Sequence, residues 1–238
     1  MEANPMRLWL IPAICLLAVG ASATDTALDA LRKARDQQNL SLLDRLISQC
    51  QQAAQSNATS AAAQYRLALA NSYAAEVAME LHDKRKAEAY AEAGIRPAQR
   101  AVEEDDKNPE YHRLLGELCG QVIPANPIFG ALKYGNCARD EIHKAIELNS
   151  RFALAYVTQG VGDYYLPESM GGGSNLALQE FDKAISLDSH LAEAYLWKGI
   201  VLRKQNRYAE ARAALEQALK LDPDRLWAKQ ELEKIPSR

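Results

Sequence analysis

Near its end the chain places small and large apolar residues at helical spacing in two consecutive segments. The stretch that starts at Ala192 reads AEAYLWKGIVLRKQNRYAEARAALEQALKLDPD. Its first half carries Gly199 and its second half carries Ala211, each flanked by larger apolar residues one helical turn away. Two antiparallel helices approach closely only where the residues at their crossing are small. The pattern therefore predicts a helical hairpin in which Gly199 lies against Ala211, and which ends before Pro223.

The same arrangement of small residues occurs in earlier parts of the chain. Units with this pattern begin at residues 63, 109, 153 and 192. The small residues that pair across the hairpins of the first three units are Ala70 with Gly94, Gly116 with Ala138, and Gly160 with Ala177. A repeated unit of two helices that cannot bury its apolar face alone stacks on its neighbours, so the repeat predicts an elongated helical array.

The unit at Ala192 resembles the tetratricopeptide repeat. The residues at the marker positions of that repeat are Tyr195, Gly199, Ala211, Leu215, Ala218 and Pro223. The spacings between units are 46, 44 and 39 residues, longer than the roughly 34 residues of the tetratricopeptide repeat. In each unit the surplus lies between the small residue of the first helix and that of the second. It therefore lengthens the hairpins on one edge of the array, where function tends to be located.

The resemblance implies an all-α fold, a right-handed α-solenoid of about five helix-turn-helix hairpins with a C-terminal capping helix. We expect a degenerate helix pair at residues 24–60, repeats with lengthened hairpins at 61–224 and the capping helix at 225–238. The middle of the chain, from LLGELCGQ through YGNCARDEIHKAIELN to ALQEFDKAISLD, is similar to the regulator of microtubule dynamics family. It is also similar to the periplasmic T-component of tripartite ATP-independent transporters. These resemblances imply a binding role and carry over no catalytic residue.

Residues 1–23 have the features of a secretory signal peptide. Arg7 precedes an apolar run from Leu8 to Val19, and Ala21 and Ala23 form the small-residue end that signal cleavage requires. We therefore expect an exported protein, either periplasmic or secreted. An uncleaved membrane anchor is the alternative, although the run is shorter than the ~20 residues needed to span a bilayer.

Charge and motif content limit the function classes. The net charge is -3, and no basic stripe provides an electrostatic basis for binding nucleic acid. The sequence shows no pairing of a nucleophile with a base and no metal-binding signature. We therefore expect a protein that is not an enzyme and that holds neither a cofactor nor a metal.

The segment LPESMGGGSN, residues 166–175, puts three glycines directly before a predicted helix. Phosphate groups bind at such helix starts. A phosphate-binding loop would also have a buried strand before it and a lysine after the last glycine, and this segment has neither. We therefore expect a flexible hairpin tip, with Ser174 or Asn175 capping the helix that follows.

The cysteines and histidines allow two readings. Cys119 and Cys137 fall on the two helices of one hairpin, so they form either a disulfide or a pair of packed thiols. Cys50 is left without a partner. A zinc site that adds His112 and His143 is a weaker alternative, because gaps of seven and six residues are wider than those of structural zinc sites.

The concave face, lined by the first helix of each unit, is the surface where we expect a partner. The units that begin at 153 and 192 offer an apolar, tyrosine-bearing patch there, made of Leu154, Val157, Val161, Tyr164, Tyr165, Leu196, Ile200 and Arg203. Such a patch suits an extended peptide, a helix or an apolar ligand, unless neighbouring hairpins cover it. The sequence therefore predicts a protein-interaction scaffold with a protein or peptide partner. The alternative is a periplasmic carrier or accessory protein that binds a small apolar ligand or a transporter component.

Overall fold

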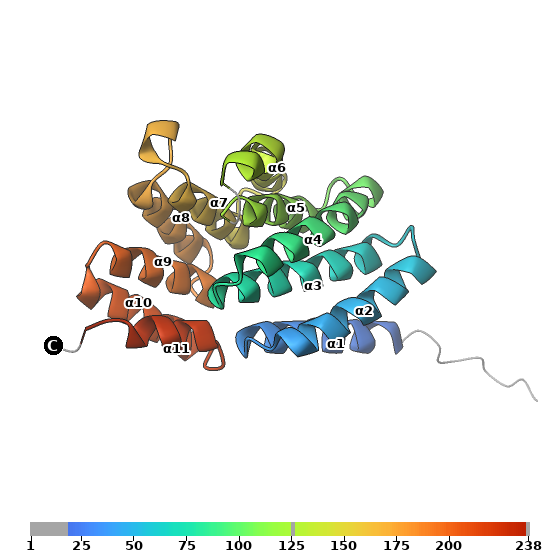
Figure 1. The fold of residues 1–238 in the computed structure, drawn as a ribbon, viewed down its shortest axis with the longest axis horizontal. Helices are drawn as coiled ribbons and strands as arrows, with labels where there is room; N and C mark the ends of the chain where they lie inside the picture. The colour runs from blue at the N-terminus through green and yellow to red at the C-terminus, as the bar shows by residue number, and fades with distance from the viewer. Residues whose placement is uncertain (1–18, 125–126, 237–238) are drawn as a thin grey trace, which may run out of the picture.

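The computed structural model describes residues 19–124 and 127–236. All regular structure in these two ranges is helical, and successive helices pack as hairpins that stack along a curved array (Figure 1). The elements are α1 (Val19–Asp36), α2 (Leu40–Ser56), α3 (Ala61–Glu80), α4 (Lys84–Glu104), α5 (Pro109–Val122), α6 (Pro127–Leu148), α7 (Ala153–Tyr165), the 3₁₀ turn η1 (Glu168–Met170), α8 (Ser174–Leu187), α9 (Ala192–Lys204), α10 (Tyr208–Leu221) and α11 (Leu226–Glu233). The predicted all-α solenoid is confirmed. Within the described ranges, every helix is too short or too polar to cross a bilayer.

Short polar side chains fix where the helices of the first half begin. Four residues, each directly before a helix, accept a hydrogen bond from a backbone N–H of the first turn: Asn39 before α2, Ser60 before α3, Asp83 before α4 and Asn108 before α5. These caps satisfy N–H groups that have no partner within the helix. The hairpin boundaries in this half are therefore set by local sequence.

The last two hairpins close at the glycines that the sequence pattern predicts. A Cβ atom at Gly199 would lie 2.6 Å from Leu215 Cγ and 3.3 Å from the carbonyl oxygen of Ala211. A Cβ atom at Gly160 would lie 2.6 Å from the ring of Phe181. Any larger residue would push the two helices of the hairpin apart. The predicted approach of Gly199 to Ala211 is confirmed.

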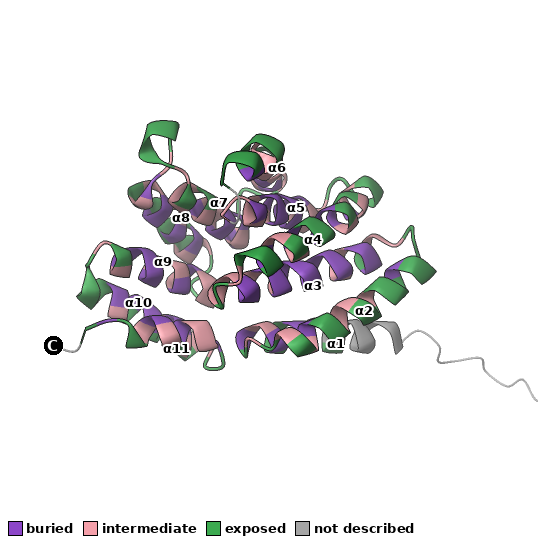
Figure 2. Ribbon diagram, in the orientation of Figure 1, coloured by how far each residue is buried: buried purple, intermediate pink, exposed green. Residues whose placement is uncertain are grey.

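The apolar core runs along the array as a series of clusters (Figure 2). One cluster joins α7 to α11 around Phe181 and Leu215, a second joins α3 to α6 around Leu114 and Leu118, and a third joins α1 to α3 around Leu43. Each hairpin thus buries its apolar face mainly against the next one, as in other repeat proteins.

The array curls until its C-terminal helix lies beside its N-terminal helix pair (Figure 1). Arg225, directly before α11, is buried, and its guanidinium contacts the carboxylates of Glu76 and Glu80 in α3. Gln230 of α11 exchanges hydrogen bonds with Gln38, which follows α1. The two ends of the solenoid therefore touch, and the molecule forms a closed ring.

Candidate partner-binding surface

Three of the residues predicted to face a partner lie in the core. Val157 is 2%, Leu196 1% and Ile200 5% exposed, and all three belong to the cluster that joins α7 to α11. The array is curved tightly enough for α7 and α9, the first helices of neighbouring hairpins, to pack directly on each other. The side chains on the inward faces of α7 and α9 fill the contact between these two helices, so they do not line a groove. The expected exposure of these three residues is wrong.

The other members of the predicted patch are only partly accessible. Leu154, Val161 and Tyr164 pack against the same cluster. Arg203 is held by α11, because its Nε and Nη2 atoms lie 2.8 and 2.5 Å from the Glu231 carboxylate. Tyr165, at the end of α7, is 48% exposed. It is therefore the member of the patch that offers the most surface to a partner.

The polar side chains on the inner face of α5 already have hydrogen-bond partners within the chain. The Arg113 guanidinium is buried and donates to Glu110 at 2.6 Å and to Glu117, which lie on the same helix. It also donates to the hydroxyl of Thr158 in α7, at 3.2 Å. These bonds join two neighbouring first helices, and they occupy the Arg113 cation that a partner would otherwise find on this part of the inner face.

A cluster of aromatic rings links three helices in the C-terminal part of the array. Ring centroids are 5.1 Å apart for Tyr164 and Tyr165, 6.4 Å for Tyr165 and Trp197, and 5.1 Å for Trp197 and Trp227. These residues come from α7, α9 and α11. Burial raises the pKa of Tyr165 to about 12, with smaller contributions from Tyr164 and Glu231. The Tyr165 hydroxyl therefore stays protonated near neutral pH and can donate a hydrogen bond.

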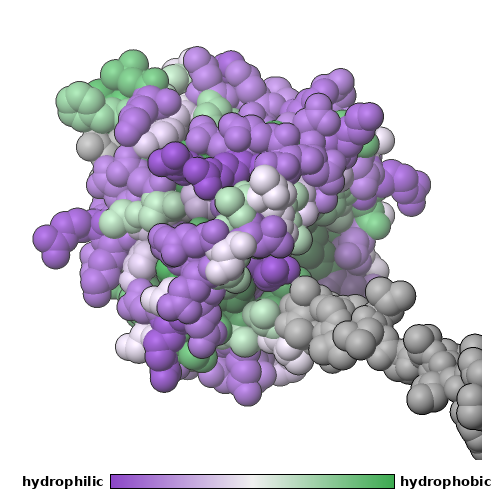
Figure 3. Space-filling view, turned by 90° about the vertical axis from the view of Figure 1, so that its right-hand side faces the viewer, coloured by the Kyte–Doolittle hydropathy of each residue, from purple (hydrophilic) through white to green (hydrophobic). Residues whose placement is uncertain are grey.

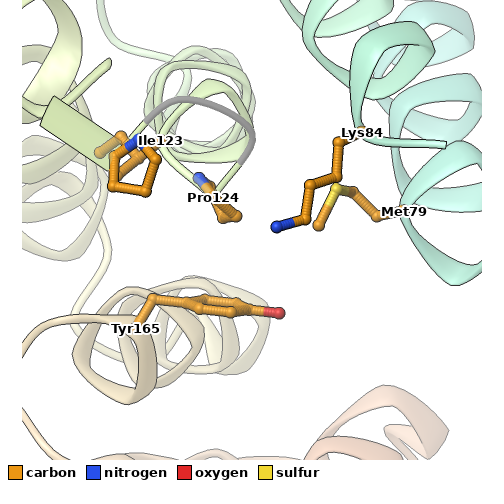
Figure 4. A pocket seen from close by; sticks show the side chains of 6 residues that line it. Met79, Lys84, Ile123, Pro124 and Tyr165 are labelled. Carbon is orange, nitrogen blue, oxygen red and sulfur yellow. The ribbon is translucent and has the colours of Figure 1, made fainter. Parts of the chain in front are cut away.

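A cavity of about 300 Å³ lies where the hairpin tips meet, and Tyr165 forms one wall of it (Figure 4). The residues that line it are Met79, Lys84, Ile123, Pro124, Pro127 and Tyr165. They come from the ends of α3, α5 and α7 and from the starts of α4 and α6. The Lys84 ammonium and the Tyr165 hydroxyl both point into the open space, whose other walls are apolar (Figure 4). The lengthened hairpins in the sequence pointed to this edge, but only Tyr165 of the lining residues was predicted.

Directly beside this cavity, the first turns of α6 expose large apolar side chains. Ile128 is 73%, Phe129 70% and Leu132 80% exposed. We call these three residues the α6 corner. The face seen in the space-filling view is mostly hydrophilic, and hydrophobic residues gather at one projecting corner of it (Figure 3). Exposed apolar groups that are contiguous usually mark a surface that another molecule covers.

The opposite face of α6 is fixed to α5. Gly130 is buried against the end of α5, which turns the neighbouring side chains of α6 outward. A disulfide between Cys119 of α5 and Cys137 of α6 ties the two helices, with their Cα atoms 6.0 Å apart. Cys50 is a free, partly buried thiol whose pKa is raised by burial. The α6 corner is therefore presented by a helix that is covalently held.

The glycine-rich segment forms the tip of the hairpin between α7 and α8. Gly171 and Gly173 adopt positive φ angles of 87° and 109°, which glycine tolerates without strain. The Gly173 N–H donates to the Asp163 carbonyl oxygen at 2.8 Å. Gly173 is the residue before α8 and no side chain caps that helix. The predicted cap by Ser174 or Asn175 is therefore wrong.

The histidine and cysteines considered for zinc have other partners. His112 Nδ1 lies 2.6 Å from Glu141 of α6, and its Nε2 lies 2.9 Å from the Asp106 carbonyl oxygen. Cys119 and Cys137 are bonded to each other. In residues 19–124 and 127–236, no three His, Cys, Asp or Glu side chains are arranged to hold a metal ion.

Several solved structures are similar to this chain, and the first of those below supports the fold. TTC0263, a thermophilic tetratricopeptide repeat protein of Thermus thermophilus, superposes with a TM-score of 0.61 at 18% identity, over 88% of this chain and 98% of that one. MamA gives a TM-score of 0.40 at 20% identity, over 78% of this chain and 92% of that one. YrrB, described as a tetratricopeptide repeat protein with an unusual peptide-binding site, gives 0.40 at 18% identity, over 88% and 99%.

Sequence comparison identifies the family. No curated protein sequence matches the chain. The family model for the tetratricopeptide repeat matches residues 192–225, the unit that carries the most complete set of markers. The family model described as regulator of microtubule dynamics protein 1-3 matches residues 19–166, more than half of the chain. The chain therefore belongs to the regulator of microtubule dynamics protein 1-3 family, and its residues 192–225 match a tetratricopeptide repeat.

Proposed function

We propose that the protein is a non-catalytic scaffold that docks a polypeptide partner on the α6 corner and the adjoining cavity. The observation that carries this proposal is the exposure of Ile128, Phe129 and Leu132 on a helix whose other face is fixed by a disulfide. Burying one such side chain in a complex is worth about 1.5–3 kcal/mol. Tetratricopeptide folds are interaction folds, which supports a polypeptide as the partner.

The cavity suggests what the partner presents. Its walls at Met79, Ile123 and Pro127 are apolar, and Lys84 has no ion pair among the described residues. An apolar side chain of the partner would fill the cavity, with an acidic group beside it facing the Lys84 ammonium. A short amphipathic segment has this chemistry.

The docking surface is tested by the double variant Phe129→Asp with Leu132→Asp. We expect it to lower partner capture at least about tenfold, because charges replace apolar anchors at the centre of the surface. Tyr208→Asp is the control, since Tyr208 is also exposed but lies on α10. Affinity capture from the natural source, quantified by mass spectrometry, should lose the same polypeptides with the double variant only. Equal capture by both variants would refute the proposed surface.

We further propose that the protein is exported and loses residues 1–23. Residues 1–18 of this segment lie outside the described residues. Cleavage after Ala23 would shorten α1 to residues 24–36 and keep Leu31 and Ala34, whose buried side chains pack on α3. The intact mass of the protein from its native compartment tests this: a mature chain that begins at Thr24 supports export, and an intact Met1 supports the uncleaved anchor.

A carrier of a small apolar ligand is the second candidate, and the volume and apolar walls of the cavity favour it. In this case the long hairpins would hold a ligand between their tips. An accessory protein that binds a transporter component would bind it on the same surface. Native mass spectrometry of protein from its source distinguishes the candidates, because a co-purifying small molecule that Tyr165→Ala releases supports the carrier. A bound polypeptide supports the scaffold.

A further inference from the structure

The contact that closes the ring centres on one buried guanidinium. Arg225 Nη2 lies 2.5 Å from Glu76 Oε1 and 2.5 Å from Glu80 Oε1, and its Nη1 lies 3.3 Å from Glu80 Oε2. Its Nε is 3.9 Å from Asp36 Oδ1, beyond hydrogen-bond distance, and has no hydrogen-bond partner among the described residues. These residues are 145 to 189 positions apart in the sequence, so the contact joins the two ends of the solenoid.

The remaining contacts between the ends are also polar. Gln38 and Gln230 donate to each other at 3.0 Å, and within the N-terminal end Gln38 also donates to Glu80 at 2.7 Å. Arg35 of α1 lies 3.7 Å from the carboxylate of Glu193 in α9. None of the apolar clusters in residues 19–124 and 127–236 contains side chains from both α1 and α11. Ring closure therefore depends on hydrogen bonds and charge.

Each end of the solenoid has its own apolar core, to which the Arg225 contact does not belong. Ala228 and Ile235 hold the last helix in the cluster that runs from α7, while Leu31 and Leu43 belong to the cluster that joins α1 to α3. Removing one partner of a buried ion pair leaves an uncompensated charge, which favours any arrangement that exposes that charge to water. We propose that Arg225 is a latch that closes the ring, and that the ring opens, without unfolding either end, when this latch is released.

The charges around Arg225 favour separation of the two ends once the latch is released. Four carboxylates, those of Asp36, Glu76, Glu80 and Glu193, surround the guanidinium groups of Arg35 and Arg225. The closed joint therefore holds more acidic than basic groups. Without Arg225 the carboxylates repel one another in a buried site, and separation of the ends lets them reach water. Ring opening is independent of what the α6 corner binds.

Spin labels on the two ends test the latch. Lys33 of α1 and Lys229 of α11 are exposed. Lys33→Cys and Lys229→Cys therefore accept labels in a background with Cys15→Ser and Cys50→Ser, which leaves the Cys119–Cys137 disulfide intact. We expect one narrow, short distance by double electron–electron resonance in the parent. Arg225→Gln should move most molecules to a longer distance. The control is Arg207→Gln, which removes an exposed ion pair with Glu210 at the start of α10 and should leave the distance unchanged.

A second variant covers the case in which Arg225→Gln fails to fold. Arg225→Ala combined with Glu76→Gln and Glu80→Gln removes the latch together with the two carboxylates that its loss would leave unpaired in a buried site. We expect this variant to keep its helical circular dichroism and to show the longer distance. A short distance in both folded variants would overturn the latch. Loss of the helical signal in both variants would also overturn the latch, because ends that have their own cores should stay folded when the latch is released.

Discussion

Gly130 of α6 lies directly against Ile123 at the end of α5, so close that a Cβ atom at Gly130 would be 2.9 Å from Ile123 Cα. Gly130→Val should push α6 away from α5 and lower the free energy of unfolding by about 1–3 kcal/mol. Gly135→Ala is the control, because no atom outside its own stretch of helix lies within 4 Å of the added methyl group. That change should raise stability by about 0.5–1 kcal/mol through helix propensity. Urea denaturation of both variants measures the difference. Equal stability of the two would show that the helices do not meet at Gly130.

The buried position of Ile200 gives a second prediction. Ile200→Asp places an unpaired charge in the cluster between α7 and α11, so the free energy of unfolding should fall by about 3 kcal/mol or more. Tyr165→Asp, at the half-exposed end of α7, should cost less than about 1 kcal/mol. Chemical denaturation followed by circular dichroism separates the two. If the Ile200→Asp variant were as stable as Tyr165→Asp, Ile200 would have to lie at the surface.

The disulfide between α5 and α6 predicts sensitivity to reductant. It closes a loop of 18 residues, and loops of this size contribute about 3 kcal/mol to stability. The urea midpoint should therefore fall on reduction, and Cys119→Ser with Cys137→Ser should reproduce the fall. The Cys50→Ser variant should respond to reductant like the parent, because Cys50 is free. A midpoint that is unchanged by reductant would contradict a stabilising role for this bond.

The latch carboxylates predict a dependence of stability on pH. Burial raises the pKa of Glu76 from 4.5 to about 8, with Glu193 and Glu80 adding to the rise and Arg225 and Arg35 opposing it. Because the folded chain holds this proton more tightly than the unfolded chain, the stabilisation is complete below about pH 4.5 and is lost as pH rises toward 8. The pKa of Glu80 is raised in the same direction, again by burial.

Thermal melts between about pH 5 and 8.5 test this dependence. The parent should become less stable across this window. Glu76→Gln, which mimics the protonated carboxyl, should flatten the slope. Glu104→Gln, at the exposed end of α4, should keep the slope of the parent. A Glu76→Gln variant with an undiminished slope would assign the titration to another group.

The sequence predicts the hairpins because their close contacts depend on single small residues. Gly160 and Gly199 occupy fixed places in the repeat, and the structure packs Phe181 and Leu215 against them. Such contacts lie within one hairpin, so a pattern of about 40 residues contains both partners. The lengthened hairpin tips are also visible in the sequence, as additional residues between these markers. The sequence therefore indicates the edge that holds the cavity, but it does not indicate which residues line the cavity.

The burial of Val157, Leu196 and Ile200 could not be predicted in the same way. Whether a first-helix position lines a groove or fills a contact depends on how tightly neighbouring hairpins curve, and that angle is the sum of many side-chain volumes. The α6 corner was missed for a related reason. Ile128, Phe129 and Leu132 have the composition of a core segment, and only the packing of Gly130 shows that they face outward.

The ring contact has no sequence signature, because Gln38, Glu80 and Arg225 are ordinary polar residues far apart in the chain. Its effect on folding is nevertheless distinctive. In an open repeat array each unit is stabilised only by its nearest neighbours, so the terminal units have one neighbour and fray first. In this chain the first and last units are neighbours of each other. Fraying at either end must break the Arg225 contact as well, so the two weakest points of a linear array protect one another.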